Sequence, residues 1–224
     1  MRQRRAATVS LLAYGVVVVA DVLAELGDAY LLTRILPVLL MPLLAGFLWW
    51  SAPRTTVARW VLLALAFAWL GDCLGDPMLL KIVFFFTTQV AYCLAFRSRW
   101  RYSLLARPVP LAAYGVVMAV LIAAVSIQAG PLWAAVIGYG ASLALMIALA
   151  TGVSRVATVG AVVFLISDLV LAYGVFVNPP ASSVNRALVM ATYLLAQLLI
   201  VLGTRRQAAA AIAQPTPGVL AGRR

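Results

Sequence analysis

Histidine is absent from this 224-residue chain, and acidic residues are scarce. Six Asp and Glu residues stand against 17 Lys and Arg residues, and there are two cysteines. Without histidine the chain lacks the commonest zinc ligand and the commonest general base, which excludes a His-ligated zinc hydrolase and a Ser-His-Asp triad. Cys73 and Cys93 have no metal-ligand spacing, so we expect both to pack as small apolar residues. We expect no metal and no other cofactor.

Charged residues of both signs are few, and long apolar runs take their place. The chain is 65% hydrophobic and 10% charged, with a mean hydropathy of +1.06, whereas soluble domains carry about 25% charged residues. Because about 20 apolar residues span a bilayer, the composition predicts an all-α membrane protein with a bundle of eight transmembrane helices. The expected spans are residues 9–26, 31–50, 60–74, 79–96, 111–127, 132–150, 156–177 and 186–203. They form one domain over residues 1–204, and residues 205–224 are expected to be a disordered, basic cytoplasmic tail.

The basic residues predict the orientation of the bundle. When alternate connections are assigned to opposite sides, fourteen of the 17 Lys and Arg residues fall on the side of both termini, and Arg34, Lys81 and Arg186 fall on the other. The positive-inside rule then places both termini in the cytoplasm, and we expect an integral protein of a bacterial plasma membrane. The net charge of +11 lies where helices meet anionic membrane lipids, so no nucleic-acid partner is expected. Asp21 and Glu25 interrupt the place of a signal-peptide cleavage site, which predicts an uncleaved first helix.

All six acidic residues lie within or beside apolar stretches, where a carboxylate is costly. They are Asp21, Glu25, Asp28, Asp72, Asp76 and Asp168. An ionisable side chain at a helix centre costs at least about 2.5–3.5 kcal/mol in a bilayer, so it usually faces the bundle interior and marks a functional site. Asp72 and Asp168 each follow a cytoplasmic arginine by about 13 residues, which places both about 20 Å from that membrane edge. Their equal depth favours a shared site.

Other polar side chains near this depth are candidates for binding a substrate. They are Asp21, Gln89, Tyr92, Ser167, Tyr193 and Gln197. Polar groups in transmembrane helices also join helices to one another, for about 0.6–2 kcal/mol each, and that alternative stays open for these residues. Each half of the chain carries a Gly-Asp or Ser-Asp pair followed by a glutamine, a pattern typical of a four-plus-four internal duplication.

Four motifs follow one another along the chain. They are Leu-Leu-Met-Pro-Leu-Leu at 39–44, Gly71-Asp72, the segment 160–168 that ends in Ser167-Asp168 and is followed by Leu171-Ala172, and Tyr-Leu-Leu-Ala-Gln-Leu-Leu at 193–199. With them, roughly residues 31–203 resemble the YhhN-like membrane proteins, whose animal members include lysoplasmalogenases. The chain departs from the family in three places. Arg34 is the only substitute for a lysine before Met-Pro, Gln89-Val-Ala-Tyr92 replaces His-x-x-Tyr, and Lys81 replaces a small residue.

The resemblance implies hydrolysis of the vinyl-ether bond of a lysoplasmalogen, a step in lipid metabolism that releases an aldehyde and a glycerophospho head group. This chemistry needs one protonated carboxyl group and one carboxylate. We assign Asp72 and Asp168 to these catalytic roles without deciding which is the acid. Arg34 or Lys81 is expected to bind the phosphate of a lysophospholipid or ether-lipid substrate. If the replaced histidine takes part in catalysis, this chain differs from the family in activity or substrate.

Two other functions use the same residues. A proton-coupled carrier would use the buried carboxylates as proton or ion sites, and it predicts aqueous access from both sides. A non-catalytic lipid-binding or scaffold protein predicts aspartates that pack dry against neighbouring helices. A hydrolase predicts a lipid-shaped cleft that opens sideways into one leaflet.

Overall fold

The computed structural model describes residues 2–213, and within that range it contains helices and no strands. Eight of these helices are long and apolar enough to cross a membrane, which confirms the expected fold class. They are α1 (Arg2–Leu26), α2 (Tyr30–Ser51), α3 (Thr56–Leu74), α4 (Met78–Phe96), α5 (Pro108–Gln128), α6 (Trp133–Ala150), α7 (Arg155–Ala172) and α8 (Ser183–Ala213). Short 3-10 turns η1 (Arg97–Tyr102), η2 (Leu104–Ala106) and η3 (Gly130–Leu132) flank α5, and a π-helical turn, η4 (Tyr173–Val177), follows α7.

The end of α8 differs from the expectation. The last span was expected to end at Gly203 and to lead into a disordered tail, but α8 continues to Ala213. The reason is local composition, because the alanines at 208–211 have the highest helix propensity of all residues and extend the helix past the apolar stretch. The rest of the expected tail, including Arg223 and Arg224, lies outside the described residues.

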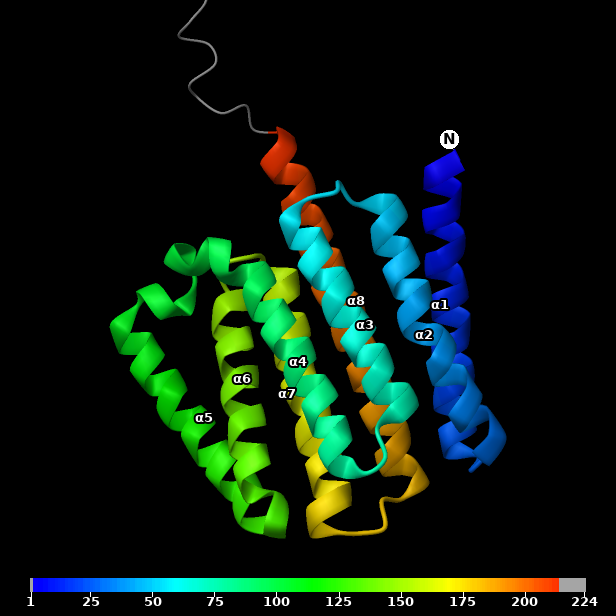
Figure 1. Cartoon of the computed structure of the whole chain (residues 1–224), viewed down its shortest axis with the longest axis vertical. Coiled ribbons are helices and arrows are strands. Elements are labelled where there is room, and N and C mark those ends of the chain that lie inside the picture. Colours follow the sequence, from blue (N-terminus) through cyan, green and yellow to red (C-terminus); the bar gives the residue numbers. More distant parts are fainter. Residues whose placement is uncertain (1, 214–224) are drawn as a thin grey trace, which may run out of the picture.

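The helices stand side by side, with α1 and α5 at opposite edges of the bundle (Figure 1). Helix α8 packs against α7, α1, α3 and α2, and α3 packs against α4 and α2. Helix α6 contacts α4, α5 and α7, whereas α5 packs mainly against α6. The expected four-plus-four duplication stays a prediction, although α3 with α4 and α7 with α8 are the two most closely packed pairs.

The N-terminus and the end of α8 lie at one end of the bundle, at the top of Figure 1, together with the α2–α3, α4–α5 and α6–α7 connections. We call this the terminal end. The other four connections lie at the opposite end, which we call the far end. The positions of the helices therefore agree with an even number of spans, while the cytoplasmic location of the termini stays a prediction.

Close packing of α7 on α8 depends on a glycine. A methyl group on Gly160 would lie 2.8 Å from the Ile200 nitrogen and 3.0 Å from the Ala196 oxygen, so only a hydrogen fits between the two backbones. Small residues let transmembrane helices approach in this way, since apolar side chains gain little from leaving lipid for another helix. A hydrogen bond from Ser167 Oγ to the Val189 oxygen, 3.0 Å long, joins the same two helices nearer the far end.

Candidate functional site

A cavity of about 130 Å³ opens in the half of the bundle nearer the far end. Its walls come from α4, α5, α6, α7, η4 and α8, and α3 contributes one residue, Asp72. Most of the lining is apolar, with Met118, Leu121, Ile122 and Val125 forming the α5 side. Its polar groups are few and come from different helices, which is the usual composition of a site for an amphiphilic ligand. They are Asp72, Lys81, Tyr139, Ser167, Asp168 and Tyr193.

Asp72 lies two residues before Leu74, the last residue of α3, and is half-buried at the cavity. Tyr193 of α8 donates a hydrogen bond of 3.0 Å to its Oδ2 atom. The tyrosine ring is held edge-on by Phe85, at 5.5 Å between ring centroids, and by Phe164, at 5.8 Å. Two packed aromatic rings therefore fix the direction in which the hydroxyl points.

Asp168 has a matching arrangement on the other side of the cavity. It is half-buried near the end of α7, and Tyr139 of α6 donates a hydrogen bond of 2.8 Å to its Oδ2 atom. Each aspartate thus faces the cavity with one oxygen bound to a tyrosine from a different helix. One carboxyl oxygen of each residue has no protein donor among the described residues.

Lys81 is the cation of the cavity lining. It lies in the first turn of α4, near the far end, and its stem packs against Gly75, where an added methyl group would lie 3.1 Å from Lys81 Cβ. Among the described residues no carboxylate lies within 4.0 Å of its ammonium group. The cavity therefore combines a cation at one end, two carboxyl groups and a long apolar wall.

The structure brings half of the expected site residues into this cavity. The cavity residues are Asp72, Lys81, Ser167, Asp168 and Tyr193. Ser167 adjoins Asp168 in the sequence, and its hydroxyl donates a hydrogen bond to the Val189 carbonyl. Ser167 is buried where α7 faces α8. A serine hydroxyl in such a place commonly donates its hydrogen bond to a backbone carbonyl of the neighbouring helix.

Five other expected residues do not line the cavity: Asp21, Arg34, Gln89, Tyr92 and Gln197. Arg34 lies instead at the far end, 3.6 Å from Asp76, with both side chains largely exposed. An exposed ion pair of this kind contributes little to stability, typically about 0–1 kcal/mol. Arg34 and Lys81 therefore lie in different surroundings, and Lys81 is the one that faces the aspartates.

The side-chain amides of Gln89 and Gln197 join helices deeper in the bundle. Gln89 of α4 accepts a hydrogen bond from Ser142 of α6, and Gln197 of α8 accepts one from Tyr92 of α4. Gln89, Tyr92 and Gln197 are fully buried. Asp21 of α1 is also fully buried, and neither of its oxygens has a hydrogen-bond partner among the described residues. The site roles of these four residues stay predictions.

Tyr139 is the polar cavity residue that sequence reasoning missed. A tyrosine in an apolar helix is ordinary, and its pairing with Asp168 depends on how α6 packs on α7. The sequence places Tyr139 near the far end of its span, level with Asp168, which is a weak signal that the site includes it. Phe85, three residues before the Thr88-Gln89 pair, was missed for the same reason.

Comparison with protein-family models matches residues 32–204 to the YhhN family. The chain belongs to the YhhN family. The matched region contains every residue of the cavity lining. Searches of curated proteins and of solved structures found no match.

The YhhN family includes lysoplasmalogenases, and in this chain Asp72 and Asp168 line one cavity. Gln89 and Tyr92, where the sequence resemblance predicted a departure from the family pattern, both lie outside the cavity lining. In the described part of the chain, no group of three or more Cys, Asp or Glu side chains is placed to hold a metal ion.

Proposed function

We propose that this YhhN protein is a membrane hydrolase that cleaves the vinyl-ether bond of a lysoplasmalogen. The observation that carries the proposal is that Asp72 and Asp168, on helices far apart in the sequence, line one apolar cavity together with Lys81. This combination matches the substrate, which has an anionic phosphate, a reactive bond next to the glycerol and a single long apolar chain. The proposed substrate class is therefore a lysophospholipid with an alkenyl ether chain.

Lys81 orients the substrate in this proposal. Its ammonium group, in the first turn of α4, binds the phosphate near the far end. The alkenyl chain lies along the apolar wall of α5 and α6, where Leu121, Ile122 and Leu143 replace contacts with lipid. The vinyl-ether carbons then lie between the phosphate and the chain, beside the carboxyl groups.

The reaction uses one aspartate as acid and the other as base. The protonated carboxyl group gives its proton to the vinyl carbon that is not bonded to oxygen, and the other vinyl carbon becomes part of an oxocarbenium ion. Water adds to that carbon and loses a proton to the second carboxylate, which gives a hemiacetal. The hemiacetal hydroxyl then returns a proton to the first aspartate while the second protonates the leaving glycerol oxygen. The carbon–oxygen bond breaks, the aldehyde leaves, and both aspartates regain their starting states.

The tyrosines hold the carboxyl groups in place for these transfers. Tyr193 occupies one oxygen of Asp72, and Tyr139 occupies one oxygen of Asp168, so a single oxygen of each is left to face the substrate. Fixing the direction of proton transfer in this way is a general source of rate enhancement. Both tyrosines are positioning residues in this proposal.

The experiment compares aldehyde release from one lysoplasmalogen preparation by the wild type and by Asp72→Asn and Asp168→Asn. Each substitution keeps the shape of the side chain and removes its acid and base function, so turnover should fall at least about 10²-fold. Asp76→Asn is the matched control, because Asp76 is 87% exposed and lies outside the cavity lining. It should keep wild-type turnover.

The tyrosine variants test positioning separately. Tyr139→Phe and Tyr193→Phe each remove one hydrogen bond to a carboxyl group, worth about 1.5–3 kcal/mol, and should lower turnover about tenfold or more with little change in KM. Tyr114→Phe is the control, because it removes a hydrogen bond to the Ala144 oxygen outside the cavity. It should leave turnover unchanged. Wild-type turnover in both aspartate variants would contradict the mechanism. Failure of the wild type to release any aldehyde would favour a carrier or a non-catalytic lipid-binding protein.

A further inference from the structure

A second cavity lies at the terminal end of the bundle, where α2 leads into α3. Its volume is about 260 Å³, several times the roughly 30 Å³ that one water molecule occupies in the liquid. Its lining, which we call the α2–α3 groove, is Leu48, Trp49, Ala52, Pro53, Arg54, Ala58, Arg59 and Leu62. None of these residues lines the cavity of the proposed hydrolase.

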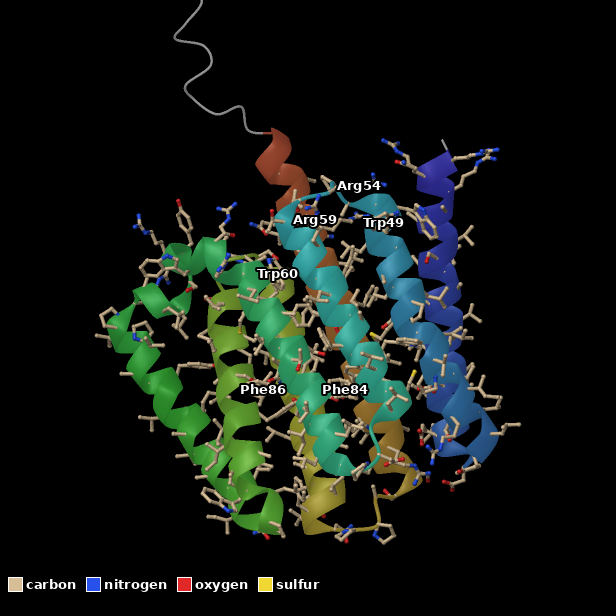
Figure 2. The ribbon with its side chains drawn as sticks, in the orientation of Figure 1. Trp49, Arg54, Arg59, Trp60, Phe84 and Phe86 are labelled. Atoms are coloured by element: carbon tan, nitrogen blue, oxygen red, sulfur yellow. The ribbon has the colours of Figure 1, made fainter. Side chains whose placement is uncertain are left out.

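Two arginines give the groove a strong positive charge. Arg54 lies on the α2–α3 connection and Arg59 in the first turn of α3, and both are exposed. Figure 2 shows both at the terminal end, close to Trp49. The Arg54 guanidinium lies 4.8 Å from the centre of a Trp49 ring, which fixes its position by a cation–π contact.

No carboxylate of the protein balances this charge. All six acidic residues lie among the described residues, and each lies in the half of the bundle nearer the far end. The three ion pairs that the described residues form are also at the far end and involve Arg34 and Arg186. Arg54 and Arg59 are therefore exposed cations that an anion from outside the protein can reach.

The wall beneath the arginines is apolar. Leu48 and Ala58 are buried and Leu62 is half-buried, so the groove continues from the charged rim toward the hydrocarbon depth of the bundle. Trp49 is 51% exposed, and tryptophan at the end of a transmembrane helix typically lies at the level of the lipid head groups. Thr55 caps the first turn of α3 by accepting a hydrogen bond from the Ala58 nitrogen, and the helix dipole adds a partial positive charge at this end of α3.

We propose that the α2–α3 groove binds an anionic phospholipid, with its phosphate between Arg54 and Arg59 and one acyl chain along Trp49 and Leu62. Guanidinium groups bind phosphate oxygens through paired hydrogen bonds, and basic pockets between transmembrane helices are recurrent sites for anionic lipids. The lipid is a stable component of the protein's surroundings and is not a substrate, because no carboxyl group reaches the groove.

The experiment uses the full-length protein, delipidated in an uncharged detergent. Phosphatidylglycerol, phosphatidylcholine with the same acyl chains and inorganic phosphate are added separately, and the shift of the thermal unfolding midpoint and the lipid retained in native mass spectra are measured. Phosphatidylglycerol should raise the midpoint and remain bound, and the other two additions should have little effect.

The decisive comparison is between two double variants that lose the same charge. Arg54→Gln with Arg59→Gln should weaken phosphatidylglycerol binding at least about tenfold, whereas Arg99→Gln with Arg101→Gln should retain it. Arg99 and Arg101 also lie at the terminal end, in η1, but outside the groove. All four arginines lack carboxylate partners among the described residues, so both variants should fold.

Equal weakening in the two variants would show that the lipid binds through diffuse surface charge, and it would overturn the proposal. An equal shift with phosphatidylcholine or with phosphate alone would overturn it as well.

Discussion

At the scale of single residues, the two cavity aspartates follow directly from the physics of the sequence. A carboxylate within an apolar helix is costly in a membrane, so it usually marks a functional site. Asp72 and Asp168 can therefore be identified as candidates from the sequence alone. Their partners do not stand out. Tyr139 and Tyr193 are ordinary amphipathic residues in apolar helices, and only the packing of α6 on α7 and of α8 on α3 points their hydroxyls at the carboxyl groups.

Asp21 gives a prediction at this scale. It is 0% exposed and neither carboxyl oxygen has a partner among the described residues. A buried polar group without a hydrogen bond costs about 1–3 kcal/mol, so Asp21→Val should raise the free energy of unfolding by about 1 kcal/mol or more. Thermal or denaturant unfolding in detergent measures this change.

Asp21→Asn is the matched control at the same position. It keeps two polar atoms without partners, so its free energy of unfolding should rise much less than that of the valine variant. A valine variant that is less stable than the wild type would show that the Asp21 carboxyl group has a partner in the protein.

At the scale of elements, the sequence predicts which segments are helical but not where each helix ends. Long apolar runs bounded by Pro and Gly identify all eight spans. The ends depend on flanking residues that favour helix without being apolar, such as the arginines that begin α1 and the alanines that end α8. The π-helical turn after α7 is likewise invisible to hydropathy, since residues 173–177 are as apolar as the helix before them.

The contact between α7 and α8 gives a prediction at this scale. Gly160→Ala places a methyl group 2.8 Å from the α8 backbone, and overpacking of this kind costs about 1–3 kcal/mol. Gly138→Ala is the control, because a methyl group there meets nothing within 4 Å. It should instead stabilise α6 by about 0.5–1 kcal/mol. Unfolding midpoints in one detergent distinguish the two, and equal effects would mean that α7 and α8 do not pack as described.

At the scale of the whole molecule, charge is divided between the two ends. Twelve of the fifteen basic residues that the structure describes lie at the terminal end, and the other three, Arg34, Lys81 and Arg186, lie in the far half with the acidic residues. Arg186 binds Glu25 at 2.8 Å and also Asp28, and Arg34 lies beside Asp76. The division itself follows from counting residues along the chain, whereas the pairing of Arg34 and Arg186 with carboxylates depends on the fold.

This division predicts the topology in the membrane. Reporter fusions after Arg101 and after Arg206 should both report the cytoplasm, and a fusion near Gly130 should report the opposite side, because basic connections are retained inside. The measurement is made in intact cells with two reporters, one that is active only in the cytoplasm and one that is active only on the opposite side of the membrane. The same side for Arg101 and Gly130 would contradict the eight-span arrangement.

Helix α5 has a consequence for how the cavity exchanges its contents. One of its faces lines the cavity, while Val116, Val117 and Val120 of the same helix are exposed, and its main neighbour in the bundle is α6. The partition between the two carboxyl groups and the surrounding medium is therefore a single helix whose outer side rests on acyl chains. Under the proposed function, we expect the fluidity of those chains to affect how fast the substrate enters or leaves past α5.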